Sequence, residues 1–450
     1  MIIGDDFMKI LLPQDVLTIL STLQNAGYEA YVVGGCVRDA LLDKVAGDWD
    51  ITTSATPQQI KSLFTHTIDT GIDHGTVTVR MNHTNYEVTT YRIESEYLDS
   101  RHPSSVSFTN LLSEDLKRRD FTINAMAYNP NDGLIDLFNG QQDLQSKTIR
   151  CVGNPKQRFE EDALRMLRAL RFSAQLNFTI EETTFNAIQQ CSHLLTNISA
   201  ERIQVELTKL LLSDHPELIE QLYTSGVSKV IMPEFDTMME TDQINPHHCY
   251  TVGKHTIEAL KHTPNDLILR YTILFHDLGK PACRTTDSKG IDHFHGHQNE
   301  SVKIASDIMK RLKFDKQSMD LILRYVEHHD TRIDPTLRAV RKMVSRLGKD
   351  LFPNLFLIQK ADMLGQSEYQ RIKKFSTLAL VERMYSKILL EQNCLSINEL
   401  AINGKDLLEL GFEAGPQIGK TLQLLLNLVL DHPDMNKKDS LITYCNNHFL

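Results

Sequence analysis

Alternating hydrophobic and polar positions predict a β-hairpin in the first third of the chain. Residues 76–80 and 86–91 alternate with a period of two, the spacing at which successive strand side chains point to opposite faces. The polar residues 82–85 between them form a turn-rich stretch, which favours a tight connection. We therefore predict two paired strands here.

From about residue 155 onward the hydrophobic period becomes helical, as in residues 160–175 and 200–212, and Ser199 is a candidate N-cap for the second of these helices. Earlier residues mix strand, turn and helix patterns. We predict an α+β fold with four parts: a small mixed-sheet head at 10–150, a helical neck at 151–240, a helical domain at 246–365 and a helical tail at 366–450.

The composition is that of a large chain with several cores, because 41% of its 450 residues are hydrophobic and 24% are charged. No apolar run reaches the roughly 18 residues of a membrane span, and the N-terminus lacks a secretion signal. We expect a cytoplasmic protein with no membrane partner. Seven cysteines without Cys-x-x-Cys spacing argue against a disulfide framework and a zinc ribbon.

A net charge of −10 does not exclude a local basic track for nucleic acid. Arg338, Lys342, Arg346 and Lys349 fall on one face of a predicted helix. An ordinary solvated helix face is the favoured interpretation of these charges. Near the C-terminus, residues 411–421 nearly form a P-loop, but a required glycine is replaced by Ala414 and no strand precedes it. We predict a glycine turn between two helices there.

Two carboxylates one residue apart suggest a magnesium site in the head. Asp48 and Asp50 would point from the same face of an extended strand, and Mg²⁺ prefers a few carboxylates together with triphosphate oxygens. Upstream, Gly34 and Gly35 allow backbone N–H groups to approach phosphate, and Arg38 can bind it with two hydrogen bonds. Glu87 in the predicted hairpin is the candidate third carboxylate, the alternative being an ordinary solvent-facing strand residue.

A second polar group lies at residues 118–124, where Arg119 is a candidate charge clamp and Asp120 and Asn124 are candidate hydroxyl partners. The alternative is a basic helix start with solvated charges.

A third group lies at helical offsets of three and four, so that its acids and arginines share one predicted helix face: Glu161, Asp162, Arg165 and Arg168. A Glu-Arg pair four residues apart is usually only a surface salt bridge. The functional interpretation is that Asp162 accepts from the exocyclic amine of cytosine or adenine while Arg165 donates to the neighbouring ring acceptor. Uracil and guanine present the opposite order and would leave buried groups unpaired.

These three ordered groups of residues resemble the motifs of bacterial class II tRNA nucleotidyltransferases, which build the tRNA 3′ CCA end and are related to bacterial poly(A) polymerases. The resemblance covers about the first half of the chain. It implies a polymerase-β-like head, Mg²⁺ as cofactor, and tRNA, CTP and ATP as partners. It also implies that Arg119, Asp120 and Asn124 contact ribose and triphosphate, and that Glu161 orients Arg165 for base selection.

Residues 92–108 are polar without a sustained period, which predicts a long loop. In related CCA-adding enzymes a flexible segment here helps to switch the pocket from CTP to ATP, and it is commonly shortened in enzymes that add only C. Its presence favours full CCA addition. CC addition, A addition and poly(A) polymerase activity are the alternatives.

A second constellation in the helical half resembles the ordered ligands of HD-type phosphohydrolases: His255, His276, Asp277 and Asp362. Imidazoles and carboxylates from separate helices can converge on a transition metal, and the resemblance implies manganese, nickel or cobalt. Lys280 would assist phosphate binding. His297, His328 and His329 make a second metal conceivable, but only the first four residues are predicted as ligands. An RNA-end phosphohydrolase is therefore the alternative function, and a purely structural HD domain is the alternative interpretation.

Overall fold

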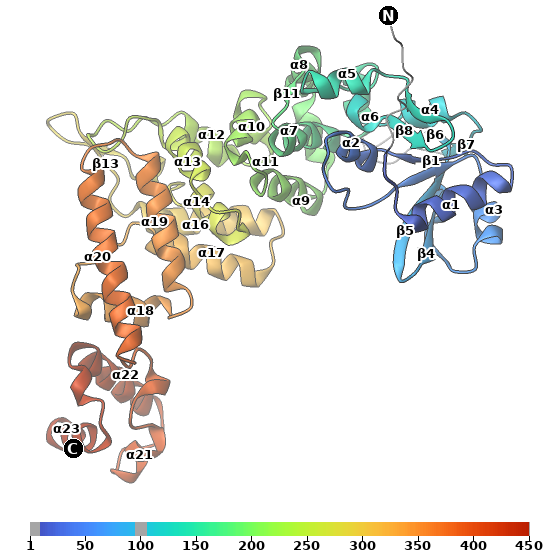
Figure 1. Cartoon of the computed structure of the whole chain (residues 1–450). Helices are drawn as coiled ribbons and strands as arrows, with labels where there is room; N and C mark the ends of the chain where they lie inside the picture. The colour runs from blue at the N-terminus through green and yellow to red at the C-terminus, as the bar shows by residue number, and fades with distance from the viewer. Residues whose placement is uncertain (1–9, 95–105, 450) are drawn as a thin grey trace, which may run out of the picture. The chain divides into compact units, whose positions relative to one another are not determined.

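The computed structural model describes residues 10–94 and 106–449. The chain divides into two compact units, Met1–Pro233 and Glu234–Leu450. Figure 1 draws both units from blue to red along the sequence. The α+β prediction is confirmed, because a mixed sheet lies in the first unit and helices make up most of the second.

A seven-stranded sheet forms the head, with strand order β3-β4-β5-β2-β1-β8-β9. Its strands are β1 (Ala30–Val33), β2 (Ile51–Thr53), β3 (Thr67–Gly71), β4 (Thr76–Met81), β5 (Thr84–Thr90), β8 (Met126–Asn129) and β9 (Gly133–Asp136). The predicted hairpin is confirmed as β4 and β5, whose turn residues Asn82 and His83 have φ of 44° and 67°. The pair β2 and β5 runs parallel, whereas the other strand pairs of this sheet are antiparallel.

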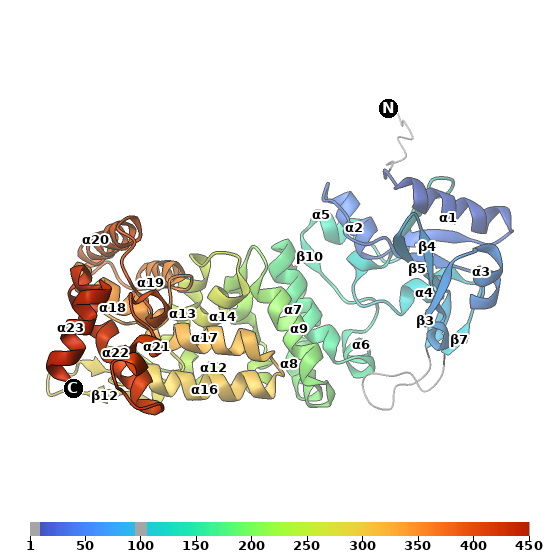
Figure 2. The same cartoon turned by 90° about the horizontal axis from the view of Figure 1, so that it is seen from below.

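Helices cover the middle of the sheet, where β1, β2 and β8 are buried along their whole length, whereas the edge strand β3 is largely exposed. The amphipathic helix α1 packs against β1 and the short helix α3, using Val16, Ile19, Leu20 and Leu23 (Figure 2). The head helices are α1 (Gln14–Asn25), α2 (Gly35–Leu41), α3 (Pro57–Leu63), α4 (Leu112–Lys117) and α5 (Gly140–Gln145).

The prediction of one long loop over residues 92–108 is wrong at both ends. The strands β6 (Arg92–Glu94) and β7 (Val106–Phe108) pair antiparallel, with Arg92 opposite Phe108. Backbone pairing of the ends replaces the expected irregular structure, and a polar sequence does not prevent such pairing. The middle of this segment, residues 95–105, lies outside the described residues.

The neck is mostly helical, as predicted, with two corrections. The predicted helix over 160–175 is broken at Asp162, whose φ of −137° and ψ of 102° are extended. A short parallel pair, β10 (Thr148–Ile149) with β11 (Thr179–Ile180), also interrupts the helices. The neck helices are α6 (Pro155–Glu161), α7 (Leu164–Leu176), α8 (Glu182–Cys191), α9 (Ala200–Leu211), α10 (Glu220–Thr224) and α11 (Ser228–Ile231). The prediction over 200–212 is confirmed as α9, and Ser199 occupies its N-cap position without a side-chain capping bond.

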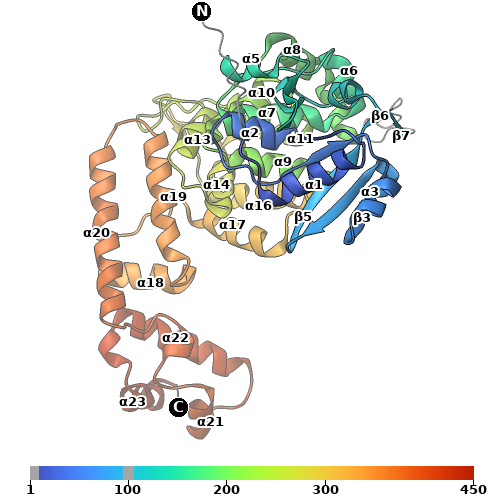
Figure 3. The same cartoon turned by 45° about the vertical axis from the view of Figure 1, so that its right-hand side comes forward.

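The second unit is built from packed helices, and Figure 3 shows α19 beside α20. Its helices are α12 (Pro233–Met239), α13 (Val252–Lys261), α14 (Leu267–Phe275), α15 (Lys280–Cys283), α16 (His297–Arg311), α17 (Lys316–His328), α18 (Leu337–Leu347), α19 (Phe352–Gly365), α20 (Arg371–Leu390), α21 (Gly404–Glu409), α22 (Pro416–Asp431) and α23 (Lys438–His448). A small hairpin pairs β12 (Thr285–Thr286) with β13 (Asp292–His293). The predicted glycine turn is confirmed between α21 and α22.

The candidate basic track on α18 is largely neutralised within the protein. Arg338 and Lys342 both pair with Asp431, and Lys349, beyond the end of the helix, pairs with Glu399. These pairs support the favoured interpretation of an ordinary helix face. The seven cysteines are all free. Across 10–94 and 106–449, each helix is too short or too polar to span a membrane.

Candidate active site and candidate metal centre

The three predicted head carboxylates lie at one edge of the parallel pair β2 and β5. Ile51 pairs with Val88 in this register, so Asp50 and Glu87 each stand one residue before the pairing starts. Burial raises the pKa of Glu87, and the charges of Asp50 and Asp48 raise it further. The structure therefore brings the three carboxylates together. Asp48 and Asp50 precede β2 instead of lying within a strand, because pairing in β2 begins at Ile51.

The repulsion among these three carboxylates indicates whether a divalent cation would fit between them. Burial raises the pKa of Asp50, Arg119 lowers it, and Asp48 raises it. One neighbouring guanidinium therefore offsets only part of the negative charge. Oxygen ligands of this kind and charge fit Mg²⁺.

Arg119 is held beside the glycine turn that ends β1. Gly34 has a φ of +85°, and a Cβ built there would lie 3.0 Å from Nη1 of Arg119. The same guanidinium is 3.4 Å from buried Asp115 through Nη2. Gly34 is thus required both for its backbone conformation and for the approach of Arg119. Gly35 begins α2 and has an ordinary φ.

A network of hydrogen bonds joins residues of all three predicted groups. Arg38 donates from Nη1 to Oδ1 of Asn124 at 2.7 Å and pairs with Asp39 at 2.8 Å. Asn124 donates in turn to Oδ1 of Asp120 at 3.1 Å. Arg168 donates to Oδ2 of Asp120 through Nε at 2.8 Å and Nη2 at 2.6 Å. The structure thus places these four predicted residues in one network.

Asp120 is the charged centre of this network. Burial raises its pKa, but Arg168 and Asn124 outweigh burial and bring the pKa to about 2. The carboxylate is therefore ionised at neutral pH, and its guanidinium partner is fixed.

Sequence reasoning missed a neighbouring buried ion pair. Arg171 lies 3.2 Å from Glu206 through Nε and 4.1 Å above the Phe172 ring. Arg38 and Arg168 also lie over this ring, at 5.0 Å and 5.4 Å. The spacing of Arg168 and Arg171, three residues apart on a predicted helix, was the signal available in the sequence.

The third predicted group surrounds the break between α6 and α7. Glu161 is 2.6 Å from Nη1 of Arg165, in agreement with its predicted orienting position. Nη2 of Arg165 donates to the Arg118 carbonyl at 2.9 Å. Asp162 accepts from the Leu164 amide at 3.0 Å and from Nη2 of Arg202 at 3.2 Å. Sequence reasoning did not identify Arg202.

In the second unit, the four predicted HD residues converge from α13, from the segment after α14, and from α19. Nε2 of His255 lies 3.2 Å from Nε2 of His276 and 2.9 Å from Oδ1 of Asp362. Nε2 of His276 lies 3.1 Å from Oδ2 of Asp277. His255, His276 and Asp362 offer ligand atoms within 4.8 Å of one another, as do His276, Asp277 and a further residue, His329.

Two more histidines, from the segments that made a second metal conceivable, join this cluster. Nε2 of His297 lies 3.4 Å from Oδ1 of Asp277 and 3.3 Å from Nε2 of His329. The Nδ1 atoms of three of these histidines lie 2.6–2.9 Å from backbone carbonyls: His276 with Ile273, His329 with Val326 and His297 with Phe294.

An Nδ1–H that donates to a carbonyl leaves Nε2 as the metal-binding nitrogen. The donor set therefore fits a transition metal. His328 is half-buried, while His329 is the member of the pair that reaches the cluster.

Lys280 lies beside this cluster, with Nζ 2.7 Å from Oδ2 of Asp277 and 2.8 Å from Oε1 of Gln243. It is 7% exposed. The positive charge of Lys280 is thus paired with Asp277 inside the cluster.

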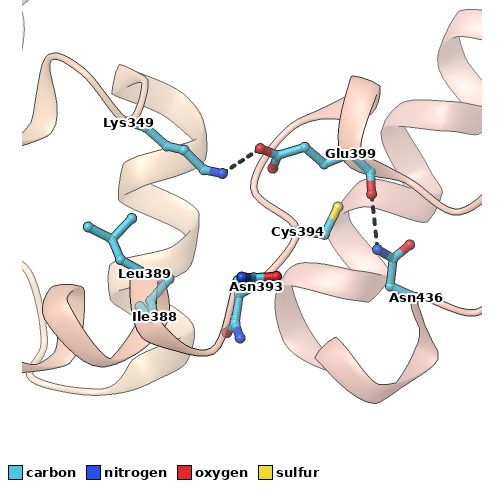
Figure 4. A pocket seen from close by; sticks show the side chains of 8 residues that line it. Lys349, Ile388, Leu389, Asn393, Cys394, Glu399 and Asn436 are labelled. Atoms are coloured by element: carbon cyan, nitrogen blue, oxygen red, sulfur yellow. Dashed lines mark hydrogen bonds and ion pairs between the residues drawn. The ribbon is translucent and has the colours of Figure 1, made fainter.

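A separate cavity of about 250 Å³ shares no lining residue with either candidate site. Its residues are Lys349, Ile388, Leu389, Gln392, Asn393, Cys394, Glu399 and Asn436. Figure 4 shows the pair of Lys349 with Glu399 and the hydrogen bond from Asn436 to the Glu399 carbonyl. The polar side chains of Lys349, Glu399 and Asn436 thus make contacts within the lining itself.

Family models match three parts of the chain. The poly(A) polymerase head domain matches residues 30–150, an RNA and SrmB-binding site of polymerase A matches 177–239, and domain 2 of tRNA nucleotidyltransferase matches 294–445.

Relatives match along nearly the whole chain. The CCA-adding enzyme of Streptococcus thermophilus is 35% identical over 433 residues, covering 96% of each chain. That of Lactobacillus helveticus is 36% identical over 428 residues, covering 95% of each. The crystal structure of the Bacillus stearothermophilus CCA-adding enzyme in complex with CTP is 28% identical, with a TM-score of 0.72 over 97% of this chain and 98% of that one. The chain belongs to the family of CCA-adding enzymes.

Proposed function

We propose that this protein is a template-independent tRNA nucleotidyltransferase that builds the 3′ CCA end from CTP and ATP and releases pyrophosphate. The observation that carries the proposal is the meeting of Asp48, Asp50 and Glu87 beside Arg119, in a chain that matches CCA-adding enzymes along 96% of its length. The acidic group suits a cation, and the arginine suits triphosphate.

In the proposed reaction the terminal 3′-hydroxyl of tRNA loses its proton to solvent and its oxygen attacks the α-phosphorus, and the bond from that phosphorus to the pyrophosphate oxygen breaks. Asp48, Asp50 and Glu87 would hold Mg²⁺, which when bound lowers the pKa of the hydroxyl and offsets phosphate charge. Arg119 stabilises negative charge on the triphosphate. Asn124 and Asp120, held by Arg38 and Arg168, provide hydrogen-bond partners for sugar hydroxyls.

Base selection is assigned to Asp162 and Arg165, one an acceptor and the other a donor. This pair complements the edges of cytosine and adenine. Glu161 orients the arginine, and Arg118 accepts from it through its carbonyl, so little of its freedom is lost at binding. Uracil and guanine would leave both groups without a partner on the base. Sites that bind their substrate through hydrogen bonds reject such analogues by roughly 10⁴-fold, which corresponds to several kcal/mol.

The test is extension of tRNA transcripts that end at the discriminator base, at C or at CC, with Mg²⁺ and CTP, ATP or both. Extension of every transcript to CCA supports the proposal. Extension of the CC end alone would indicate an A-adding enzyme, and a product ending in CC would indicate a CC-adding enzyme. Asp50→Asn should abolish extension, whereas Asp69→Asn, a control whose partner is exposed Lys61, should retain it. Full activity of Asp50→Asn would refute the assignment.

We propose a second activity, metal-dependent hydrolysis of phosphate esters at the cluster of His255, His276, Asp277 and Asp362. The backbone carbonyls beside Nδ1 of His276, His297 and His329 leave Nε2 of each ring for the cluster, which favours this activity over a structural HD domain. The residues named would hold manganese, nickel or cobalt, which when bound supplies a hydroxide nucleophile near neutral pH. Lys280 keeps Asp277 ionised and in place.

The two activities can be separated by substitution. Asp48→Ala should abolish nucleotide addition and leave hydrolysis intact, while His276→Ala combined with Asp277→Ala should do the reverse. If each change abolished both activities, two independent sites would be refuted.

A further inference from the structure

The cluster of candidate metal ligands lies beside the N-terminal end of α20. The segment before α13 is tied to the connection between α19 and α20, because Ser367 donates to the His247 carbonyl at 2.9 Å and to the Pro246 carbonyl at 2.6 Å. Asp362, near the end of α19, is 13% exposed, whereas His255 and His276 are fully buried. The rim formed by these segments is therefore next to the least buried ligand.

Two cations of α20 reach this rim by hydrogen bonds to one residue, Gln366: one to its side-chain amide and the other to its backbone carbonyl. Lys374 donates from Nζ to Oε1 of Gln366 at 2.5 Å, and Gln366 donates from Nε2 to Oδ2 of Asp362 at 2.9 Å. Arg371 donates from Nη2 to the Gln366 carbonyl at 2.5 Å. A single side chain thus separates the ammonium group from a candidate metal ligand.

The charge of a third cation, Arg332, also acts on Lys374. Burial lowers the pKa of Lys374, Asp362 and Asp330 raise it, and Arg332 and Arg371 lower it. The charges of both arginines therefore act on the Lys374 ammonium group. In addition, Nε of Arg371 is buried without a hydrogen-bond partner among the described residues. Such a group of cations, with an unsatisfied guanidinium donor, is suited to an anion that carries more than one charge.

We propose that Lys374, Arg371 and Arg332 bind the phosphoryl group of the ester that the metal cluster hydrolyses. This inference rests on the second proposed activity. A phosphate monoester has a charge near −2 at neutral pH and three acceptor oxygens, which matches three cations better than a carboxylate does. The cations hold the non-bridging oxygens while the ester bond faces Asp362 and its neighbours.

Binding is tested with inorganic phosphate, by isothermal titration of the full chain with and without Mn²⁺. Lys374→Gln and Arg371→Gln should each weaken phosphate binding about tenfold, the loss expected for one charge-assisted contact. Lys373→Gln is the matched control, since Lys373 is exposed on the same helix. Lys374→Arg, which keeps the charge, should restore most of the affinity. Equal affinity in Lys374→Gln and Lys373→Gln, or no binding by the unaltered protein, would overturn the proposal.

Hydrolysis distinguishes the sources of the phosphoryl group and separates the two proposals. With Mn²⁺, Lys374→Gln should raise KM for p-nitrophenyl phosphate and for an RNA ending in a 3′-phosphate, with kcat nearly unchanged. A raised KM for the RNA alone would assign the rim to RNA ends. If Lys374→Gln lost phosphate binding but the unaltered protein hydrolysed neither substrate with any metal, the hydrolase proposal would be refuted and the phosphate site would remain supported. Hydrolysis with an unchanged KM would refute the rim site alone.

Discussion

Replacing Asp120 by asparagine should destabilise the first unit more than any loss of a surface ion pair. The carboxylate of Asp120 accepts two hydrogen bonds from Arg168, one from Asn124 and one from the Phe121 amide at 2.8 Å. Asparagine keeps the shape and one acceptor oxygen, but it places an N–H₂ group or a neutral oxygen against the guanidinium. The substitution therefore removes charge without creating a cavity.

The magnitude follows from the pKa of the carboxyl. A pKa of about 2 in place of 3.8 corresponds to about 2.4 kcal/mol at neutral pH, because each pH unit contributes about 1.36 kcal/mol. Breaking a fully buried pair costs about 3–5 kcal/mol, but the Arg168 side chain is 34% exposed, so water offsets part of this loss. We expect a loss of about 2–3 kcal/mol. The pKa is depressed in the folded state, so this stabilisation is complete above about pH 4 and disappears as the pH falls towards 2.

Urea denaturation followed by tryptophan fluorescence measures this loss in the right unit, because Trp49 is the only tryptophan of the chain and lies in the head. The control is Asp69→Asn, since Asp69 pairs with Lys61 and both side chains are at least 39% exposed. That substitution should cost less than about 1 kcal/mol. Equal losses in the two variants would refute the reasoning, as would a difference between Asp120→Asn and the unaltered protein that stays constant from pH 7 to pH 3.

Three further outcomes are expected. Gly34→Ala should lower the stability of the head by about 1–2 kcal/mol, from the positive φ, and should lower kcat for CTP addition by displacing Arg119; an unchanged kcat would contradict this. Arg202→Gln removes a charge-assisted bond to Asp162 and should lower kcat/KM about tenfold for CTP and ATP, but less for UTP. The assay measures each nucleotide separately, and equal losses for all three would contradict this prediction. Asp431→Ala should cost at most about 1 kcal/mol in urea denaturation, since its two partners are exposed, and a larger loss would show that the α18 pairs are structurally important.

Local patterns in the sequence were sufficient for the elements that neighbouring residues determine. The hairpin was predictable because period-two alternation flanks Asn82 and His83, residue types that tolerate positive φ better than most others. The helix α9 was predictable because its apolar residues recur at helical spacing. The meeting of Asp50 with Glu87 required the parallel pairing of β2 with β5, which no local pattern specifies.

Partners far apart in sequence account for most of what was missed. Nothing near Arg338 or Lys342 indicates that Asp431 neutralises both. Likewise, His329 joins the metal cluster because α17 ends beside α14, and its neighbour His328 has the same chemistry but a different direction at the end of that helix. Residue type identified the candidates, whereas packing selected among them.

The break at Asp162 explains why a prediction of contacts was right where a prediction of backbone was wrong. Offsets of four residues brought Glu161 to Arg165, and this contact exists although the helix ends at Glu161. The carboxylate of Asp162 instead accepts from the Leu164 amide, a bond that competes with helix continuation. It thereby lies at the N-terminus of α7, where the helix dipole favours a negative charge. A continuous helix would have placed the same carboxylate beside backbone groups that are already bonded. The residue that interrupts the helix is the one proposed to accept from the base. The local rule therefore fails at the position where the proposed function needs a hydrogen-bond acceptor.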